Sequence, residues 1–124
     1  MDTRERTRNG PMHEVGIIQN TLDLAVKSAQ ASGATQIHQL RLRVGAMTGV
    51  VPDALQFAFD VVRQGTMAAD ARLDVESVPA TCWCAGCRTE FPSADLAYEC
   101  PQCGQVSAEL RRGLELELVS LEVT

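Results

Sequence analysis

The chain has 124 residues, of which 45% are hydrophobic but only 4% aromatic, and its formal net charge is -5. This length allows one modest domain and a small satellite around an aliphatic core, and it disfavours a large enzyme cleft. The acidic balance disfavours nucleic-acid binding, because affinity for phosphates depends on a basic surface. Since the sequence contains neither an apolar run long enough to span a membrane nor a secretory signal, we expect a cytoplasmic protein that does not bind membranes.

The N-terminal part predicts a leader, a helix and a strand. Residues 1–11 are polar and charged, which is typical of a disordered leader. From Met12 to about Ser32, apolar residues recur at three- and four-residue steps and predict a helix. Gln36–Gly45 alternates between apolar and polar residues, as a half-buried strand does, with these residues inward: Leu40, Leu42 and Val44. His38 shares their phase, so we expect a partly buried structural histidine.

A second helix and two strands are predicted further along the chain. Pro52 suits the first turn of a helix that runs to Gly65, with Leu55, Phe59 and Val62 on its buried face. A strand is expected at about Ala71–Val78, with Leu73 and Val75 inward. The last strand alternates from Leu114 onward and then slips by one residue, which predicts a bulge near Val119–Ser120.

Two Cys-x-x-Cys pairs lie between the last two predicted strands. Cys84 and Cys87 form the first pair, and Cys100 and Cys103 form the second after a spacer of twelve residues. Each pair predicts a tight turn that presents two thiolates, and four thiolates are the ligand set of a closed tetrahedral zinc site. Such a site has no open position for water, so it stabilises a fold and does not hydrolyse a substrate. A block this small is expected to need its metal in order to fold.

Other interpretations of the cysteines stay open. Two disulfides would need an oxidising compartment and would leave an odd thiol. A rubredoxin-like iron centre would make the chain an electron-transfer module, which a red colour would reveal, whereas a small zinc ribbon would serve protein interaction. Cys82, the fifth cysteine, is expected to be a strand side chain beside Trp83 rather than a spare ligand or a redox thiol. An enzyme is disfavoured, because neither histidine has an evident nucleophile partner and no glycine-rich phosphate loop is present.

Together these elements predict an α+β fold in which two helices cover one face of a three-stranded sheet. The cysteine block is expected to be an inserted zinc-ribbon subdomain with rubredoxin-like knuckles, spanning residues 80–111. The main domain would then combine residues 12–79 with 112–124.

Met12, His13 and Glu14 stand together at the start of the first predicted helix. If the chain began at Met12, its amine, the deprotonated amide nitrogen of His13 and the His13 imidazole would form a chelate. Glu14 would supply an amide or carboxylate as the fourth ligand. Nitrogen-rich tetragonal sites favour Ni(II) or Cu(II). A lone exposed histidine is usually only solvated, so the motif gains weight from the helix and the cysteines that follow it.

Over residues 12–124 the sequence resembles the HypA/HybF family of hydrogenase maturation nickel chaperones. The resemblance rests on these motifs: Met12-His13-Glu14, Val44-Gly45, Pro52-Asp53-Ala54-Leu55, Phe57-Ala58-Phe59, the four cysteines and Leu118-Val119-Ser120-Leu121-Glu122-Val123. It implies a transported Ni2+ held by His13 with the Met12 amine and Glu14, and a structural Zn2+ held by Cys84, Cys87, Cys100 and Cys103. The partners it implies are a nickel-handling GTPase, the hydrogenase large subunit and, for some members, urease accessory proteins. Whether the chain forms a homodimer is left open.

The chain departs from that family at its start. Eleven residues precede Met12, and a peptide bond to Pro11 would abolish the amine ligand. The leader contains neither His nor Cys to replace it. We therefore expect translation to start at Met12. The alternative is a genuine leader with altered nickel binding.

Overall fold

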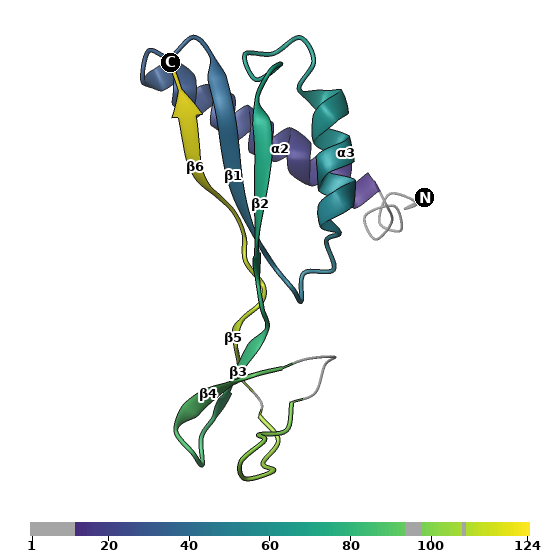
Figure 1. The fold of residues 1–124 in the computed structure, drawn as a ribbon, viewed down its shortest axis with the longest axis vertical. Helices are drawn as coiled ribbons and strands as arrows, with labels where there is room; N and C mark the ends of the chain where they lie inside the picture. Colours follow the sequence, from purple (N-terminus) through teal and green to yellow (C-terminus); the bar gives the residue numbers. More distant parts are fainter. Residues whose placement is uncertain (1–11, 94–97, 108) are drawn as a thin grey trace, which may run out of the picture.

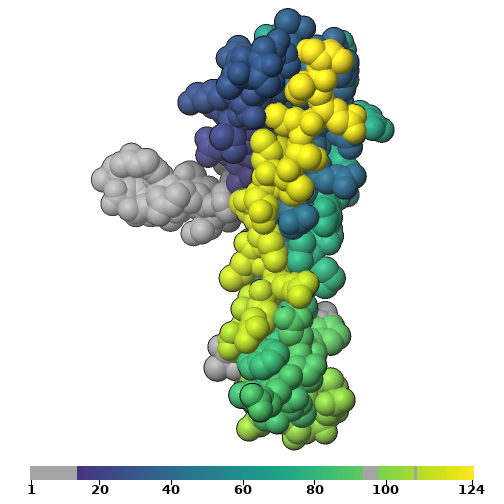
Figure 2. Space-filling view, turned by 90° about the vertical axis from the view of Figure 1, so that its left-hand side faces the viewer, coloured from purple at the N-terminus to yellow at the C-terminus, as the bar shows by residue number. Residues whose placement is uncertain are grey.

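The computed structural model describes residues 12–93, 98–107 and 109–124, so the predicted leader lies outside the described residues. Two three-stranded sheets occupy opposite ends of an elongated molecule (Figure 1). The view at a right angle shows the same elongated outline, with the C-terminal strand along the visible side (Figure 2). The elements are α2 (Met12–Ala31), β1 (Ile37–Gly45), α3 (Pro52–Val62), β2 (Arg72–Val78), β3 (Thr81–Cys84), β4 (Thr89–Pro92), β5 (Leu110–Arg112) and β6 (Leu116–Val123).

The larger sheet has the order β2-β1-β6 and carries the main core. β1 is parallel to β2 and antiparallel to β6. A parallel pair needs a crossover connection, and α3 supplies it. α2 packs on α3, β1 and β6, and α3 packs on β2, so the two helices shield one face of this sheet (Figure 1). The largest fully buried side chains between the helices and this sheet are Ile18, Ile37, Leu40, Leu42, Leu55 and Phe59. The predicted α+β class is therefore confirmed.

The predicted bulge in the last strand is confirmed, whereas the predicted start of that strand was wrong. Arg41 pairs with Ser120 and Leu42 with Leu118, so Val119 is the extra residue. The strand begins at Leu116, and Leu114 is 65% exposed. β1 ends at Gly45, so no strand remains for Leu114 to pair with, and the chain turns away toward the smaller sheet.

The prediction for His38 was also wrong, because this side chain is exposed. The register between β1 and β6 shifts between Ile37 and Gln39, which inserts one extra residue into β1 at this point. Ile37 is fully buried instead. The His38 ring nitrogen Nε2 lies 2.9 Å from the hydroxyl of Thr124 at the chain end. A bulge thus reverses the alternation on which the prediction depended.

The two sheets meet at a tight backbone crossing. A Cβ atom at Gly45 would lie 2.1 Å from both the carbonyl carbon and the carbonyl oxygen of Gly113, so only glycine fits. The amide of Met47 donates to the carbonyl of Gly113 at 2.7 Å, and the amide of Gly45 donates to the carbonyl of Glu115 at 2.8 Å. The amide of Ala46 donates to the carbonyl of Val78 at 2.9 Å. We call this crossing, formed by Gly45, Ala46, Met47, Val78 and Gly113–Glu115, the joint.

Candidate metal centre

The four predicted zinc ligands converge in space. The Sγ atoms of Cys84, Cys87, Cys100 and Cys103 all lie within 4.8 Å of one another. Cys84 and Cys103 are 3.5 Å apart, and Cys87 and Cys100 are 3.9 Å apart. These separations exceed a disulfide bond of about 2.05 Å. A tetrahedral zinc ion with Zn–S bonds of about 2.3 Å requires sulfurs roughly 3.8 Å apart, so the quartet fits that metal.

Two equivalent turns position the sulfurs. In the first turn the Cys87 amide lies 3.4 Å from the Cys84 sulfur, and the Arg88 amide donates to the Cys84 carbonyl at 2.7 Å. In the second turn the Gln102 amide lies 3.4 Å from the Cys100 sulfur, and the Gly104 amide donates to the Cys100 carbonyl at 2.8 Å. Amides that point at a sulfur stabilise its thiolate form. Each turn thus holds one metal ligand through the same contact between a backbone amide and its sulfur.

The closing residue of each turn has a left-handed backbone. Gly104 has a φ of 77° and Arg88 a φ of 56°, and Arg88 is the one residue other than glycine with a positive φ among those that the structure describes. The two residues occupy the same offset from their cysteine pairs. Comparison of the two motifs in the sequence would have signalled this strained position, which our sequence analysis missed.

Electrostatics within the quartet favour a cation. Hydrogen bonds from the backbone amides of Cys103 and Gln102 lower the pKa of Cys100 to about 7. The hydrogen bond with Cys103, followed by burial, raises the pKa of Cys87 to about 12. Crowded thiolates repel one another, so they cannot all ionise without a metal. Metal uptake must therefore expel protons, and its affinity falls as the pH falls.

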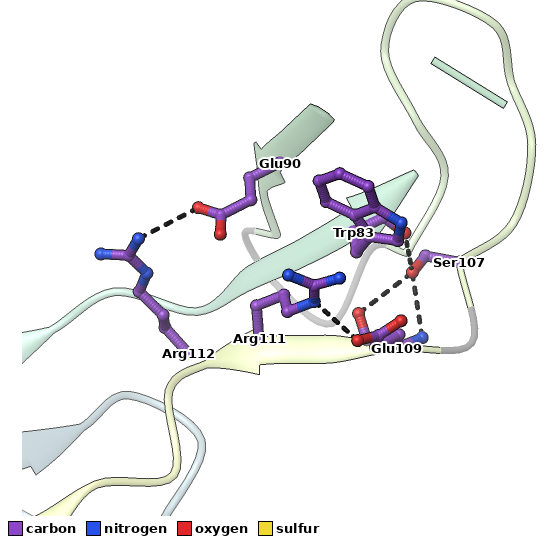
Figure 3. Close-up of polar contacts among 6 residues, drawn as sticks. All are labelled: Trp83, Glu90, Ser107, Glu109, Arg111 and Arg112. Carbon is purple, nitrogen blue, oxygen red and sulfur yellow. Dashed lines mark hydrogen bonds and ion pairs between the residues drawn. The ribbon is translucent and has the colours of Figure 1, made fainter. Parts of the chain in front are cut away.

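A polar brace joins the second turn to β3 (Figure 3). The guanidinium carbon of Arg111 lies 4.3 Å from the centroid of the Trp83 ring, and its Nε pairs with Glu109 at 2.6 Å. Ser107 Oγ lies 2.7 Å from the Trp83 carbonyl oxygen and accepts from the Glu109 amide at 3.1 Å. The brace holds Ser107, Glu109 and Arg111, which follow the second turn, against Trp83. Trp83 is the neighbour of the predicted ligand Cys84. Our sequence analysis missed the brace, because Trp83 lies 24 residues before Ser107 in the chain.

Cys82 stands apart from the quartet, as predicted. It lies in β3, is only 1% exposed and packs with Phe91. β4 and β5 flank β3, and this small sheet carries the first turn at the end of β3. Of the three short strands, the sequence indicated β3 alone, through Cys82 and Trp83. β4 and β5 were not predicted, because four or fewer residues show no clear alternation.

The second predicted site, at Met12, His13 and Glu14, is described only in part. α2 begins at Met12, and its side chains are described from Glu14 onward, so the side chains of Met12 and His13 lie outside the described set. Glu14 is 8% exposed, and its Oε2 accepts a hydrogen bond from the Val51 amide at 3.2 Å. Val51 precedes α3 and makes no capping hydrogen bond with its own side chain. Glu14 therefore ties the first turn of α2 to the start of α3.

Comparison with known proteins identifies the family and the fold. The family described as "Hydrogenase/urease nickel incorporation, metallochaperone, hypA" matches residues 12–123. The chain belongs to the HypA family. The hydrogenase maturation factor HypA of Picosynechococcus sp. is 49% identical over 112 residues, which cover 90% of this chain and 99% of that protein. HypA of Chloroflexus aggregans is 42% identical over 113 residues, which cover 90% of this chain and 98% of that protein.

Solved HypA structures share the fold. The solution structure of the Ni metallochaperone HypA from Helicobacter pylori aligns with a TM-score of 0.63 at 22% identity and covers 89% of this chain and 96% of that one. A second solution structure of a HypA protein aligns with a TM-score of 0.66 at 25% identity and covers 93% of this chain and 98% of that one. The predicted class, a nickel metallochaperone of hydrogenase maturation, is therefore confirmed at the level of the family, whose description names nickel incorporation. The four clustered cysteines could hold the predicted zinc. The iron and electron-transfer alternative is not favoured. Among the described residues, no helix combines the length and the apolar character needed to cross a bilayer.

Proposed function

We propose that this protein is a carrier that holds Ni(II) at its N-terminal motif and passes it on for the maturation of nickel-iron hydrogenase. Zinc, held by Cys84, Cys87, Cys100 and Cys103, would act as a structural metal and supply no catalysis. The observation that carries the proposal is the convergence of these four sulfurs within 4.8 Å in a chain that matches the HypA family over residues 12–123. The division into a main domain of residues 12–79 plus 112–124 and a ribbon of residues 80–111 belongs to this proposal.

The main chain at the start of α2 supports nickel binding there. The first four amides of an α-helix have no partner within the helix, so those of His13 and Glu14 are available to a metal. Together with the His13 imidazole and the Met12 amine, they would form a nitrogen-rich set that suits Ni(II). The Glu14 carboxylate already holds the Val51 amide, which leaves the Glu14 amide nitrogen as the more accessible of its ligand atoms.

A site at a chain end suits transport better than storage. Ligands can be exchanged one at a time when a metal is open on one side, so nickel need not pass through water between two proteins. Copper would bind such ligands more tightly at equilibrium, so selection must come from docking and from metal availability. We infer that the receivers are a nickel-handling GTPase and the hydrogenase large subunit in the cytoplasm, with urease accessory proteins as further candidates.

Metal analysis of the chain started at Met12 tests the proposal. We expect one zinc that resists mild chelation and one nickel that is lost in His13→Ala, while zinc is retained. His38→Ala is the matched control, because the other histidine of the chain is exposed on β1 and should leave both metals in place. The chain with its leader should bind nickel more weakly, since Pro11 blocks the amine. Failure of both chains to take up nickel would leave only a small zinc domain.

A further inference from the structure

The outer face of α3 exposes a row of apolar side chains. Phe57 is 73% exposed, Val61 58% and Val51 51%. The other two phenylalanines of the chain, Phe59 and Phe91, are buried. Ala54, Phe57 and Val61 follow one another at three- and four-residue steps, so their side chains lie along one stripe of the helix. A largely exposed aromatic side chain within an apolar row is typical of a docking surface, where such residues contribute most of the binding energy.

Carboxylates border this row. Asp53 lies in the first turn of α3, and Asp60 follows two turns later on the same side of the helix. Both side chains are exposed, and the nearest cation to Asp60, Arg63, is 3.8 Å away and also donates to the carbonyl of Ala71. If a second copy docked the same face, these carboxylates would approach one another and repel. The charge pattern therefore favours a different partner with basic groups.

The position of this face connects it with the N-terminal motif. Val51 begins the apolar row, and its amide is the group that Glu14 holds at 3.2 Å. A partner seated on the row would lie beside the first turn of α2. This placement gives a receiving protein direct access to a metal at that end of the chain.

We propose that the outer face of α3, formed by Val51, Ala54, Phe57 and Val61 with Asp53 and Asp60, is the docking surface for a helical partner segment that carries apolar and lysine or arginine side chains. The inference deepens the proposed nickel transfer and rests on it for its purpose. Docking itself requires no nickel and is tested without it.

Peptide binding to the zinc-loaded, nickel-free protein tests the surface. The probe is a short synthetic helical peptide with a leucine stripe flanked by lysines, and a matched peptide replaces each lysine by glutamate. We expect the lysine peptide to bind and the glutamate peptide to bind at least about tenfold more weakly. Affinity should also fall as salt is raised, because exposed charges are screened.

Substitutions on α3 and α2 show which side chains contribute to peptide binding. Phe57→Ser should weaken binding of the lysine peptide at least about tenfold, because it removes a central aromatic contact. Leu24→Ser is the matched control, since Leu24 is 57% exposed on α2 and should change affinity less than about twofold. Asp53→Asn combined with Asp60→Asn should reduce both the affinity and its salt dependence, whereas Asp23→Asn on α2 should not.

Three results would overturn the proposal. One is an equal effect of Phe57→Ser and Leu24→Ser on peptide affinity. Another is equal binding of the two peptides. The third is a dimer in sedimentation experiments that Phe57→Ser converts to a monomer, since a second copy would then cover the face. Nickel uptake by Phe57→Ser should match that of the parent chain, so failure of docking and failure of nickel binding are distinguishable.

Discussion

At the scale of single residues, Arg88 is the clearest case of strain beside the cysteine quartet. Its left-handed backbone, with φ of 56°, costs an L-residue about 1–2 kcal/mol, whereas Gly104 takes the equivalent position in the second turn freely. Arg88→Gly removes that strain but adds about 0.5–1 kcal/mol of chain entropy to be lost on folding. We expect a net stabilisation of about 0.5–1 kcal/mol, measured by thermal unfolding of the zinc-loaded protein.

The matched variant is Arg88→Ala, which removes the same exposed side chain but keeps the strained backbone. It should give no gain in stability. If Arg88→Ala stabilises the zinc-loaded protein as much as Arg88→Gly, then side-chain charge rather than backbone strain explains the change.

At the scale of elements, the joint controls how the ribbon is attached to the larger sheet. A Cβ at Gly45 would meet the Gly113 backbone at 2.1 Å, so Gly45→Ala must push the two segments apart and break the hydrogen bonds of the joint. We expect a loss of about 3 kcal/mol in the free energy of unfolding, measured with denaturant.

Gly16→Ala provides the control for that substitution. Gly16 lies inside α2, and apart from its chain neighbours and the nearby backbone of the helix itself, no atom lies within 4 Å of a Cβ built there. Alanine should therefore stabilise the helix by about 0.5–1 kcal/mol. A loss of stability in Gly45→Ala no larger than about 0.5 kcal/mol would show that the joint is pliable.

Elements defined by local patterns were predictable, and features set by distant partners were not. Some patterns can be read from a short stretch of sequence. These are the helical spacing in α2 and α3, the alternation in β1 and the change of phase at Val119. His38 was misplaced because its orientation depends on a bulge opposite β6. The hydrogen bond from Val51 to Glu14 joins positions 37 residues apart, and no local pattern reports it. Cysteine spacing predicted the quartet, but not the Trp83 brace that supports it.

At the scale of the whole molecule, the two sheets depend on different forces. The larger sheet and its helices share a continuous core that includes Leu22, Leu40, Leu55 and Phe59. The smaller sheet buries mainly Cys82, Cys84, Phe91 and Cys100, with Leu110 packed against them. Burial of these few apolar side chains cannot offset the conformational entropy lost when the ribbon becomes ordered. A metal must therefore supply the remaining stability.

Removal of zinc should therefore unfold the ribbon and leave the larger sheet intact. With a strong chelator we expect hydrogen exchange to rise sharply across β3, β4 and β5, while β1 and α2 keep their protection. The single tryptophan, Trp83 in β3, gives a second measure through its fluorescence. Chelation should become easier as the pH is lowered, because zinc binding keeps a proton off Cys87, whose pKa without metal is about 12. Simultaneous loss of protection in β1 and β3 would instead mean that both sheets unfold as one unit and that the metal stabilises the whole chain.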